Sequence, residues 1–192
     1  VHFLGLLSDG GIHAHINHVK SLCDGAAAFG LDDLFIHAFT DGRDTDPKSG
    51  KRYLEELQDH LDKTTGKIAS VTGRYYAMDR DKRWERVKLA YDAMVNGIGH
   101  KTQNIPSAID ASYANDVTDE FIMPIINTND AGEPLGTIQA DDVVICFNFR
   151  TDRGREITEA LTQQDFEEVG MKKLPLRYVT MTNYDDTFEG VK

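Results

Sequence analysis

The sequence predicts a single α/β domain of three layers, a mostly parallel sheet flanked by helices, with a small antiparallel addition in its second half as an option. Two observations support this fold class. Short apolar runs of strand length alternate with stretches whose apolar residues recur at helical spacing, which is the pattern of parallel βαβ units with right-handed crossovers. The 192 residues, of which 40% are hydrophobic, suffice for one core, and they contain no internal repeat or low-complexity segment.

The first half of the chain contains the clearest elements. Three apolar runs are predicted as buried strands: Val1–Leu7, Leu34–Thr40 and Lys67–Thr72. Apolar residues at helical spacing from Ile16 to Phe29 predict a helix that Gly30 ends. A second helix follows Ser49, its expected N-cap residue, and its apolar face consists of Tyr53, Leu54, Leu57 and Leu61.

The segment after the third strand concentrates positive charge. Four of the ten arginines lie between Arg74 and Arg86, in a chain with a formal net charge of −11. Because arginine binds carboxylate or phosphate bidentately and never loses its charge, this cluster predicts a local anion site. We expect a helix from Asp79 onward, whose N-terminus would add its own attraction for an anion. Its apolar face would consist of Trp84, Val87, Tyr91, Met94 and Val95. The alternative is a solvated helix start in which the arginines are neutralised by Asp79, Asp81 and Glu85.

The second half of the chain is less regular. Helices are expected near Pro106–Tyr113 and Glu156–Leu161, and strands at Asp142–Phe149 and Leu176–Met181. Phe121–Ile126 is a further strand candidate, which Pro124 would confine to an edge of the sheet. Asp130–Glu133 is predicted as a turn, with a hairpin as one form of it.

Composition limits the classes of partner. The 32 acidic residues outnumber the 21 basic ones, which argues against nucleic acid and against an anionic membrane surface, but not against a small anion in a local pocket. No apolar run approaches the about 20 residues of a membrane span, and no signal peptide is visible. Cys23 and Cys146 lie in separate apolar runs, so we expect reduced core thiols in a cytoplasmic protein. The abrupt ends, Val1 and Lys192, are those expected of a domain cut from a longer chain.

Charged residues follow four of the predicted strands. They are found in Asp9–His13, Asp41–Asp44, Gly73–Arg74 and Arg150–Arg153. The carboxyl ends of parallel strands lie along one edge of a sheet, where α/β folds place ligands, so these residues are expected to converge on an anion-binding site. Each segment alone also has a structural interpretation, because Asp-Gly pairs form turns, His13 can cap a helix and Arg150 can pair with a nearby carboxylate.

Other chemistries have weaker support in the sequence. A metal site built on His13, His15 and His18 is disfavoured, because only the last two share a helix face and neither spacing suits zinc. Ser8 lacks the flanking glycines of a nucleophile elbow. Asp44, next to a fixed positive charge, is the better acid–base candidate, with a salt-bridged turn aspartate as the alternative.

Four motifs together resemble the 2,3-bisphosphoglycerate-independent phosphoglycerate mutases. They are Ser8–His15, His37–Asp44, Gly73–Arg86 and Phe147–Arg153, and the resemblance covers essentially the whole chain. Four long motifs in the right order are specific, whereas any one of them alone would be weak. One departure is Thr151, where proline is common in that family.

This resemblance implies a two-domain enzyme of which residues 1–192 are one domain. In that family an alkaline-phosphatase-like domain holds two manganese ions and the serine nucleophile. The inserted phosphotransferase domain, which this chain is similar to, grips phosphoglycerate, so no metal site is expected here. The substrate contacts carried over by motif are His13, Arg43, Asp44, Arg74, Arg80, Arg150 and Arg153.

The implied reaction interconverts 3-phosphoglycerate and 2-phosphoglycerate through a phosphoserine intermediate on the other domain. Arg150 and Arg153 are expected on the phosphate, and Asp44 in the proton relay. The glycerate end would be held by Arg43, Arg74, Arg80 and His13. The isolated chain is expected to have no mutase activity. The alternatives are a stand-alone binding module for a small phosphorylated carboxylic acid and, more distantly, a phosphatase-like metallohydrolase built on the histidines.

Overall fold

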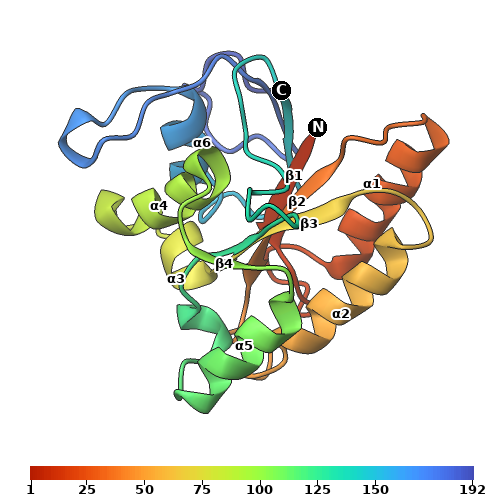
Figure 1. The fold of residues 1–192 in the computed structure, drawn as a ribbon. Coiled ribbons are helices and arrows are strands. Elements are labelled where there is room, and N and C mark those ends of the chain that lie inside the picture. Colours follow the sequence, from red (N-terminus) through yellow and green to blue (C-terminus); the bar gives the residue numbers. More distant parts are fainter.

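The computed structural model describes residues 1–192 and arranges seven strands in one sheet (Figure 1). The strands are β1 (His2–Leu6), β2 (Phe35–Thr40), β3 (Lys67–Gly73), β4 (His100–Thr102), β5 (Ile125–Asn127), β6 (Val143–Cys146) and β7 (Arg177–Thr180). Their order across the sheet is β4-β5-β3-β2-β1-β6-β7. All pairs are parallel except β3 with β5, so β4 and β5 form an antiparallel addition to a parallel sheet. The predicted α/β fold is confirmed.

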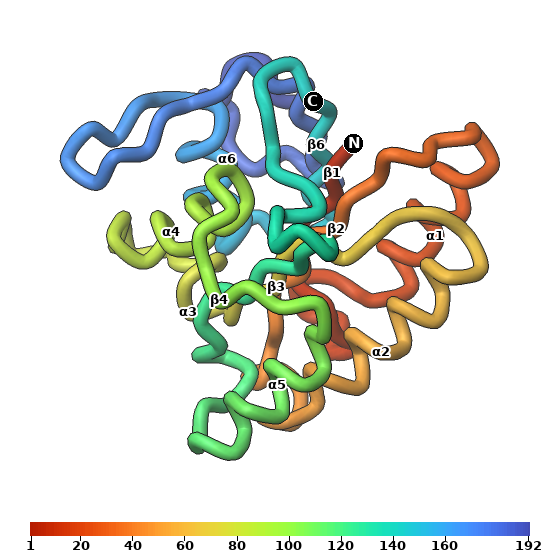
Figure 2. Tube along the Cα trace, in the orientation of Figure 1, coloured from red at the N-terminus to blue at the C-terminus, as the bar shows by residue number.

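Helices cover both faces of the sheet, which makes it the middle of three layers (Figures 1 and 2). They are α1 (Ile16–Ala28), α2 (Gly50–Leu61), α3 (Arg74–Ala77), α4 (Trp84–Tyr91), α5 (Ile105–Ala114) and α6 (Arg155–Thr162). On one side α2 packs against both α1 and α5, and on the other α4 packs against α6. Short helical segments are the π-helix η1 (Asp92–Asn96) and the 3-10 helices η2 (Asp119–Phe121) and η3 (Glu167–Val169).

The core lies on both faces of the central strands. All five residues of β1 are buried, which explains why this strand is a continuous apolar run rather than an alternating one. Cys23 and Cys146 are buried and free, as expected for core thiols. Phe29, expected on the apolar face of α1, lies beyond its last turn and is 87% exposed. No helix of the chain is long and apolar enough to cross a membrane.

The arginine-rich segment differs from its prediction. The sequence predicts a helix from Asp79, but α3 begins directly at Arg74 and, after a loop, helix resumes only at Trp84. Asp79 organises the loop, because its Oδ2 accepts the backbone N–H groups of Asp81 at 2.9 Å and Arg83 at 3.0 Å. Such side-chain bonds to nearby backbone compete with helix formation. The arginines are therefore distributed over a short helix, a loop and a second helix.

The expected N-cap of α2 is also wrong. Ser49 occupies the N-cap position, but its hydroxyl donates to the carbonyl of Asp46 at 2.7 Å and makes no capping bond. The N–H of Gly50 donates instead to Oδ2 of Asp119 at 2.7 Å. A carboxylate 69 residues further along the chain therefore satisfies the helix start.

The strand near Pro124 is shorter and more central than expected. β5 begins after Pro124 and lies between β4 and β3, so it is not an edge strand. Pro124 has no N–H to donate, but it precedes the strand, so β5 loses no ladder hydrogen bond. The carbonyl of Pro124 accepts the N–H of His100 at 2.8 Å. The edge strand on this side of the sheet is β4, which the sequence pattern did not indicate because only three residues form it.

Candidate anion-binding site

The order of the strands reverses between β1 and β6. From β1 the chain proceeds to β2 and β3 on one side, whereas β6 and β7 lie on the other. Ligands of open α/β sheets bind outside the carboxyl ends of the strands at such a reversal. The segments that follow β1, β2, β3 and β6 are the four in which the sequence predicts site residues, and the structure brings these segments together.

Arg74 lies at the centre of this convergence. Its Nη1 is 2.8 Å from Oδ1 of Asp41 and 2.6 Å from Oδ2 of Asp44, and its Nη2 is 3.2 Å from Nε2 of His13. Burial alone would lower the pKa of Arg74, but the hydrogen bonds to Asp44 and Asp41 raise it. A fixed guanidinium therefore joins the ends of β1, β2 and β3.

Two glycines let the chain pass closely at this edge. A Cβ on Gly73 would lie 2.4 Å from the carbonyl oxygen of Glu120, so only glycine allows η2 to cross the end of β3. Gly42 has a φ of +68°, in the left-handed region, and turns the chain after Asp41. Oδ1 of Asp41 then accepts the N–H of Asp44 at 2.9 Å, which fixes the loop that carries Asp44.

His13 presents a buried hydrogen-bond donor. Burial and the neighbouring Arg74 lower the pKa of His13 to about 4, although Asp152 and Asp44 oppose the shift, so the imidazole is neutral at pH 7. Because Arg74 can only donate, Nε2 is the acceptor and the proton lies on Nδ1. Nδ1 is buried, has no hydrogen-bond partner and lies 3.7 Å from Oδ1 of Asp152.

Asp152 is a site residue that the sequence analysis missed. Its Oδ1 is 2.9 Å from Nε of Arg150, and its Oδ2 accepts from Nη1 of Arg80 at 3.0 Å. Burial would raise the pKa of Asp152, but Arg150, Arg80 and His13 lower it. The alternating Arg and Asp of residues 150–153 indicate the local pair, but the bond to Arg80 spans 72 residues and has no local signal.

A pocket of about 400 Å³ opens beside Arg74. Six arginines contribute to its wall: Arg43, Arg74, Arg80, Arg83, Arg86 and Arg153. Only three carboxylates do so, those of Asp79, Asp81 and Glu120, and Tyr75 and Phe121 form the apolar part. The pocket therefore has excess positive charge in an acidic chain. This excess disfavours the alternative of a fully neutralised, solvated helix start.

The predicted site residues divide into two groups. Arg43, Arg74, Arg80 and Arg153 line the pocket. His13, Asp44 and Arg150 are not among its lining residues, but each contacts Arg74 or Asp152. Arg83 and Arg86 are additional members, and the arginine-rich segment itself was the signal for them.

Arg153 experiences the charge repulsion among the arginines of the pocket. Its Nη1 donates to the carbonyl of Met78 at 2.9 Å. Burial and the nearby guanidinium groups of Arg74 and Arg80 lower the pKa of Arg153. An arginine cannot lose its proton at pH 7, so the repulsion is relieved when an anion enters the pocket.

The remaining candidates have structural roles. Ser8 is buried and its hydroxyl donates to Oδ2 of Asp41 at 2.7 Å. His15 caps α1, since its Nδ1 accepts the N–H of Asn17 at 3.1 Å, and the ring of His18 packs edge-on against Phe149. No group of three or more His, Cys, Asp or Glu side chains is arranged to hold a metal ion.

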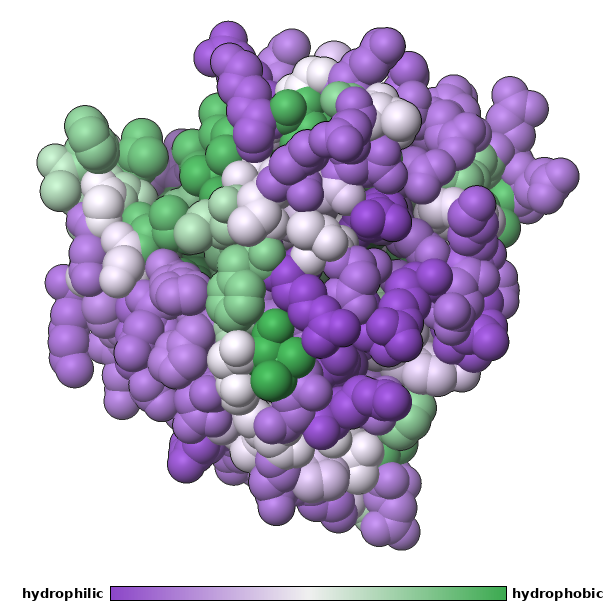
Figure 3. Space-filling model, turned by 180° about the vertical axis from the view of Figure 1, so that it is seen from behind, coloured by the Kyte–Doolittle hydropathy of each residue, from purple (hydrophilic) through white to green (hydrophobic).

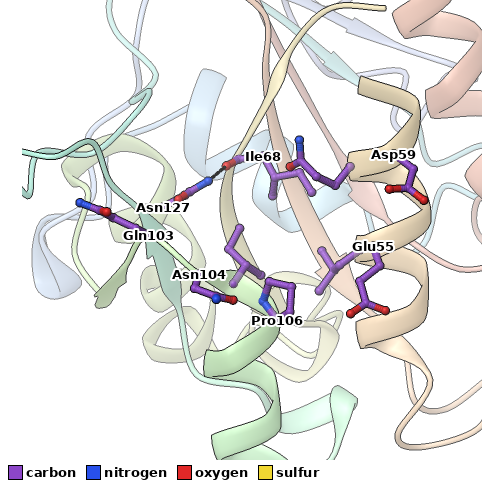
Figure 4. Close-up of a pocket in the computed structure, with 10 residues that line it drawn as sticks. Glu55, Asp59, Ile68, Gln103, Asn104, Pro106 and Asn127 are labelled. Atoms are coloured by element: carbon purple, nitrogen blue, oxygen red, sulfur yellow. Dashed lines mark hydrogen bonds between the residues drawn. The ribbon is translucent and has the colours of Figure 1, made fainter. Parts of the chain in front are cut away.

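A second pocket, of about 290 Å³, lies between α2 and the start of α5 (Figure 4). Glu55 and Asp59 of α2 stand at its rim, and the amide of Asn127 donates to the carbonyl of Ile68 at 2.8 Å. Its two carboxylates and the absence of any lining arginine or lysine make it unsuitable for an anion. The face shown in Figure 3 is mainly hydrophilic, and its most hydrophilic side chains gather near the middle.

Comparison with known proteins gives one consistent result. The family model described as "BPG-independent PGAM N-terminus" matches residues 1–186. Proteins named 2,3-bisphosphoglycerate-independent phosphoglycerate mutase match the whole chain, with 60% identity in Flavobacterium johnsoniae, 57% in Bacteroides thetaiotaomicron and 51% in Clostridium novyi. The chain spans only 37–38% of the length of these relatives.

The fold has a close counterpart among solved structures. A crystal structure of Leishmania mexicana phosphoglycerate mutase at low cobalt concentration superposes with a TM-score of 0.89 at 36% identity. The match covers 96% of this chain and 36% of that one.

Proposed function

The chain belongs to the BPG-independent phosphoglycerate mutase family, whose N-terminal model it matches, and we propose that it forms the substrate-binding part of such a mutase. The complete protein would interconvert 3-phosphoglycerate and 2-phosphoglycerate. The observation that carries this proposal is the pocket lined by six arginines next to the cluster of Arg74, Asp44 and His13. Several guanidinium groups suit a small substrate that carries both a phosphate and a carboxylate.

The two ends of the substrate would use different parts of the site. Arg150 and Arg153 bind the phosphate in this proposal, and Arg153 gains most because its charge is crowded by other arginines. The glycerate end lies against Arg43, Arg74, Arg80 and His13. The Nδ1–H of His13 then donates to a substrate oxygen, since no protein group accepts from it.

Asp44 is the group proposed to move a proton. When a glycerate hydroxyl attacks the phosphoserine, its oxygen–phosphorus bond forms as the serine oxygen–phosphorus bond breaks, and the hydroxyl proton needs an acceptor. Asp44 is half-buried, and its Oδ2 is held 2.6 Å from Nη1 of Arg74 and 3.8 Å from Nε2 of His13. A carboxylate of fixed position therefore lies beside two of the side chains proposed to bind the glycerate end.

The rest of the active site is proposed to lie outside this chain. The family resemblance implies an alkaline-phosphatase-like domain that supplies the serine nucleophile and two manganese ions. Residues 1–192 contain no group of three or more His, Cys, Asp or Glu side chains that could hold such an ion. We propose that residues 1–192 bind phosphoglycerate but do not turn it over alone, and that the protein is cytoplasmic, consistent with its buried free thiols.

A second candidate is a binding module without catalysis. The observation that favours it is that Ser8, a hydroxyl near the site, is buried and committed to Asp41. The side chains of the site as described bind and orient an anion, and none is an activated nucleophile. Turnover by the complete protein distinguishes the two functions.

The direct test is calorimetric titration of the chain with 3-phosphoglycerate. Arg43→Ala and Arg52→Ala form a matched pair, because both side chains are mostly exposed and each makes one long ion pair, with Glu120 at 3.5 Å and Asp9 at 3.4 Å. Only Arg43 lines the pocket. We expect Arg43→Ala to weaken binding about tenfold, or about 1.4 kcal/mol, and Arg52→Ala to leave it unchanged. Equal affinities, or no binding by the unchanged chain, would contradict a preformed site.

A further inference from the structure

Glu156 is a buried carboxyl that the proposed reaction does not use. It lies in the first turn of α6 and is 6% exposed. Its Oε1 accepts the backbone N–H of Lys82 at 2.8 Å, and its Oε2 is buried with no donor to accept from. A buried carboxylate oxygen without a partner is costly, so the unpartnered Oε2 calls for an explanation.

The loop that Glu156 binds forms part of the pocket wall. Residues 78–83 connect α3 to α4, and Arg80 and Arg83 from this loop line the anion pocket. Lys82 has a φ of +57°, in the left-handed region that non-glycine residues seldom occupy. The bond from Lys82 to Glu156 therefore holds the loop in a conformation that it would not adopt by itself.

Asp79 supplies the missing partner of Glu156. Both carboxyls bind the same short loop, because Oδ2 of Asp79 accepts the N–H groups of Asp81 and Arg83 and Oε1 of Glu156 accepts the N–H of Lys82 between them. Burial together with the neighbouring Asp79 raises the pKa of Glu156 to about 7. The other charged group that acts on Glu156 is Glu159, on the same helix. Arg83 and Arg86, from the α4 side, lie 3.8 Å and 3.5 Å from Oδ1 of Asp79. Burial would raise the pKa of Asp79, but the backbone N–H groups of Arg83 and Asp81 and, to a smaller extent, the charge of Arg86 lower it. Asp79 therefore stays ionised and the shared proton lies on Glu156, whose Oε2 becomes a donor.

We propose that Glu156 is a positioning residue, which shares a proton with Asp79 and in that form fastens the 78–83 loop against α6 so that Arg80 and Arg83 face the pocket. The inference rests on the proposed function only for the identity of the anion. When the proton is lost, two buried carboxylates face each other and repel. The loop then loosens, and the pocket loses arginines from its wall, so anion affinity falls as the pH rises through about 7.

One spectroscopic readout needs no ligand. Trp84 is the only tryptophan, begins α4 directly after the loop, and has its ring centroid 4.0 Å from that of Phe166. We expect its fluorescence to change with a midpoint near the pKa of Glu156, about 7. Glu156→Gln retains an acceptor for Lys82 and a donor for Asp79 but cannot ionise, so this variant should show no transition. Glu159→Gln is the matched control and should keep it.

The second readout is the affinity for 3-phosphoglycerate at about pH 6 and about pH 8.5, measured for the unchanged chain and for Glu156→Gln. Ionisation of the ligand affects both proteins equally. Between the two pH values the unchanged chain should lose roughly tenfold more affinity than the variant, because the form in which Glu156 carries a proton and holds the loop becomes scarce at high pH. Glu156→Ala should bind weakly at both pH values.

The two readouts separate the inference from the proposed function. If Glu156→Gln retains the fluorescence transition, or if its affinity changes with pH as much as that of the unchanged chain, the positioning role is wrong. If the transition appears only when Glu156 is present but no protein binds 3-phosphoglycerate, the positioning role is supported and the proposed ligand is wrong.

Discussion

Arg74 and Asp41 form a buried ion pair, with Nη1 of the guanidinium 2.8 Å from Oδ1 of the carboxylate and side chains only 3% and 1% exposed. Both partners belong to the protein, so the chain itself orients Arg74 at the edge of the sheet. Such preorganisation lowers the entropy lost on binding. It also gives Arg74 a structural role that the exposed arginines of the pocket do not have.

Removal of Arg74 should therefore destabilise the fold. In Arg74→Ala the buried carboxylate of Asp41 loses its counter-charge, and we expect the free energy of unfolding in urea to fall by about 3–5 kcal/mol. Arg43→Ala, at an exposed position, should change it by less than about 0.5 kcal/mol. A loss below about 1 kcal/mol for Arg74→Ala would show that the pair contributes little. Loss of ligand binding in Arg74→Ala alone is thus no proof of substrate contact.

The proton-transfer role proposed for Asp44 makes a kinetic prediction for the complete protein. Asp44→Asn keeps the shape of the side chain but removes its basicity, so kcat should fall at least about 100-fold with a smaller change in KM. Asp46→Asn is the control, because Asp46 lies in the same loop, is exposed, and its carboxylate accepts only the N–H of Lys48. A kcat for Asp44→Asn within about tenfold of the original enzyme would contradict the role.

The fold and the main site residues follow from local patterns. Alternating strands and helices determine a parallel sheet, and a parallel sheet brings the ends of β1, β2, β3 and β6 to one edge. The position of Arg74 could therefore be anticipated from the end of its strand alone. What could not be anticipated depends on side chains that meet across the fold. Asp119 caps α2 over 69 residues, and Asp152 binds Arg80 over 72 residues.

The same reason explains the error in the arginine-rich helix. Periodicity from Asp79 to Val95 predicts one continuous helix, and nothing in that window shows that Glu156 binds the N–H of Lys82. A tertiary contact thus overrides a local preference, as it commonly does where propensity is weak. Local spacing also gives Ser49 the appearance of a cap, although the capping carboxylate comes from η2.

The cap of α2 can be tested by stability. Asp119 is completely buried, accepts the N–H of Gly50 at 2.7 Å, and is hydrogen-bonded to the hydroxyl of Tyr113. Asp119→Ala removes the acceptor of the buried N–H of Gly50 and of the partly buried Tyr113 hydroxyl, so we expect a loss of about 2–4 kcal/mol in the free energy of unfolding. Ser49→Ala should cost about 0.5 kcal/mol or less. Similar losses for the two variants would restore Ser49 as the cap.

Acid should destabilise the chain through three buried histidines. Burial lowers the pKa of His2 and of His13 to about 4, and that of His37 well below its ordinary value. As the pH falls from 6.5 to 4, the unfolded chain takes up protons at these positions and the folded chain does not. Stability present above pH 6.5 is therefore lost, at up to about 1.4 kcal/mol per histidine and pH unit.

Urea unfolding at a series of pH values measures this slope. His13→Gln, which keeps an acceptor for Arg74 but does not titrate in this range, should reduce the slope by about 1.4 kcal/mol per pH unit. His100→Gln, at an exposed position, should leave it unchanged. An identical slope in His13→Gln and in the unchanged chain would mean that His13 binds a proton in the folded state.

Glu156 should change stability with pH in the opposite direction to the histidines, because it stabilises the folded chain at low pH. Its pKa is raised in the folded chain from 4.5 to about 7, mainly by burial, so between these values the folded state holds a proton that the unfolded state has released. The contribution of Glu156 to stability is complete below pH 4.5, decreases as the pH rises to about 7, and is constant above that. Glu156→Gln does not titrate, so it should match the unchanged chain near pH 4.5 and exceed its free energy of unfolding by about 3 kcal/mol at about pH 8. Glu159→Gln should show a much smaller pH-dependent difference.

If the advantage of Glu156→Gln is the same at both pH values, the proton is not held in the folded chain. A positive result would mean that the chain gives up stability at neutral pH to keep an ionisable group beneath the loop that carries Arg80, which is expected where a residue serves binding rather than folding.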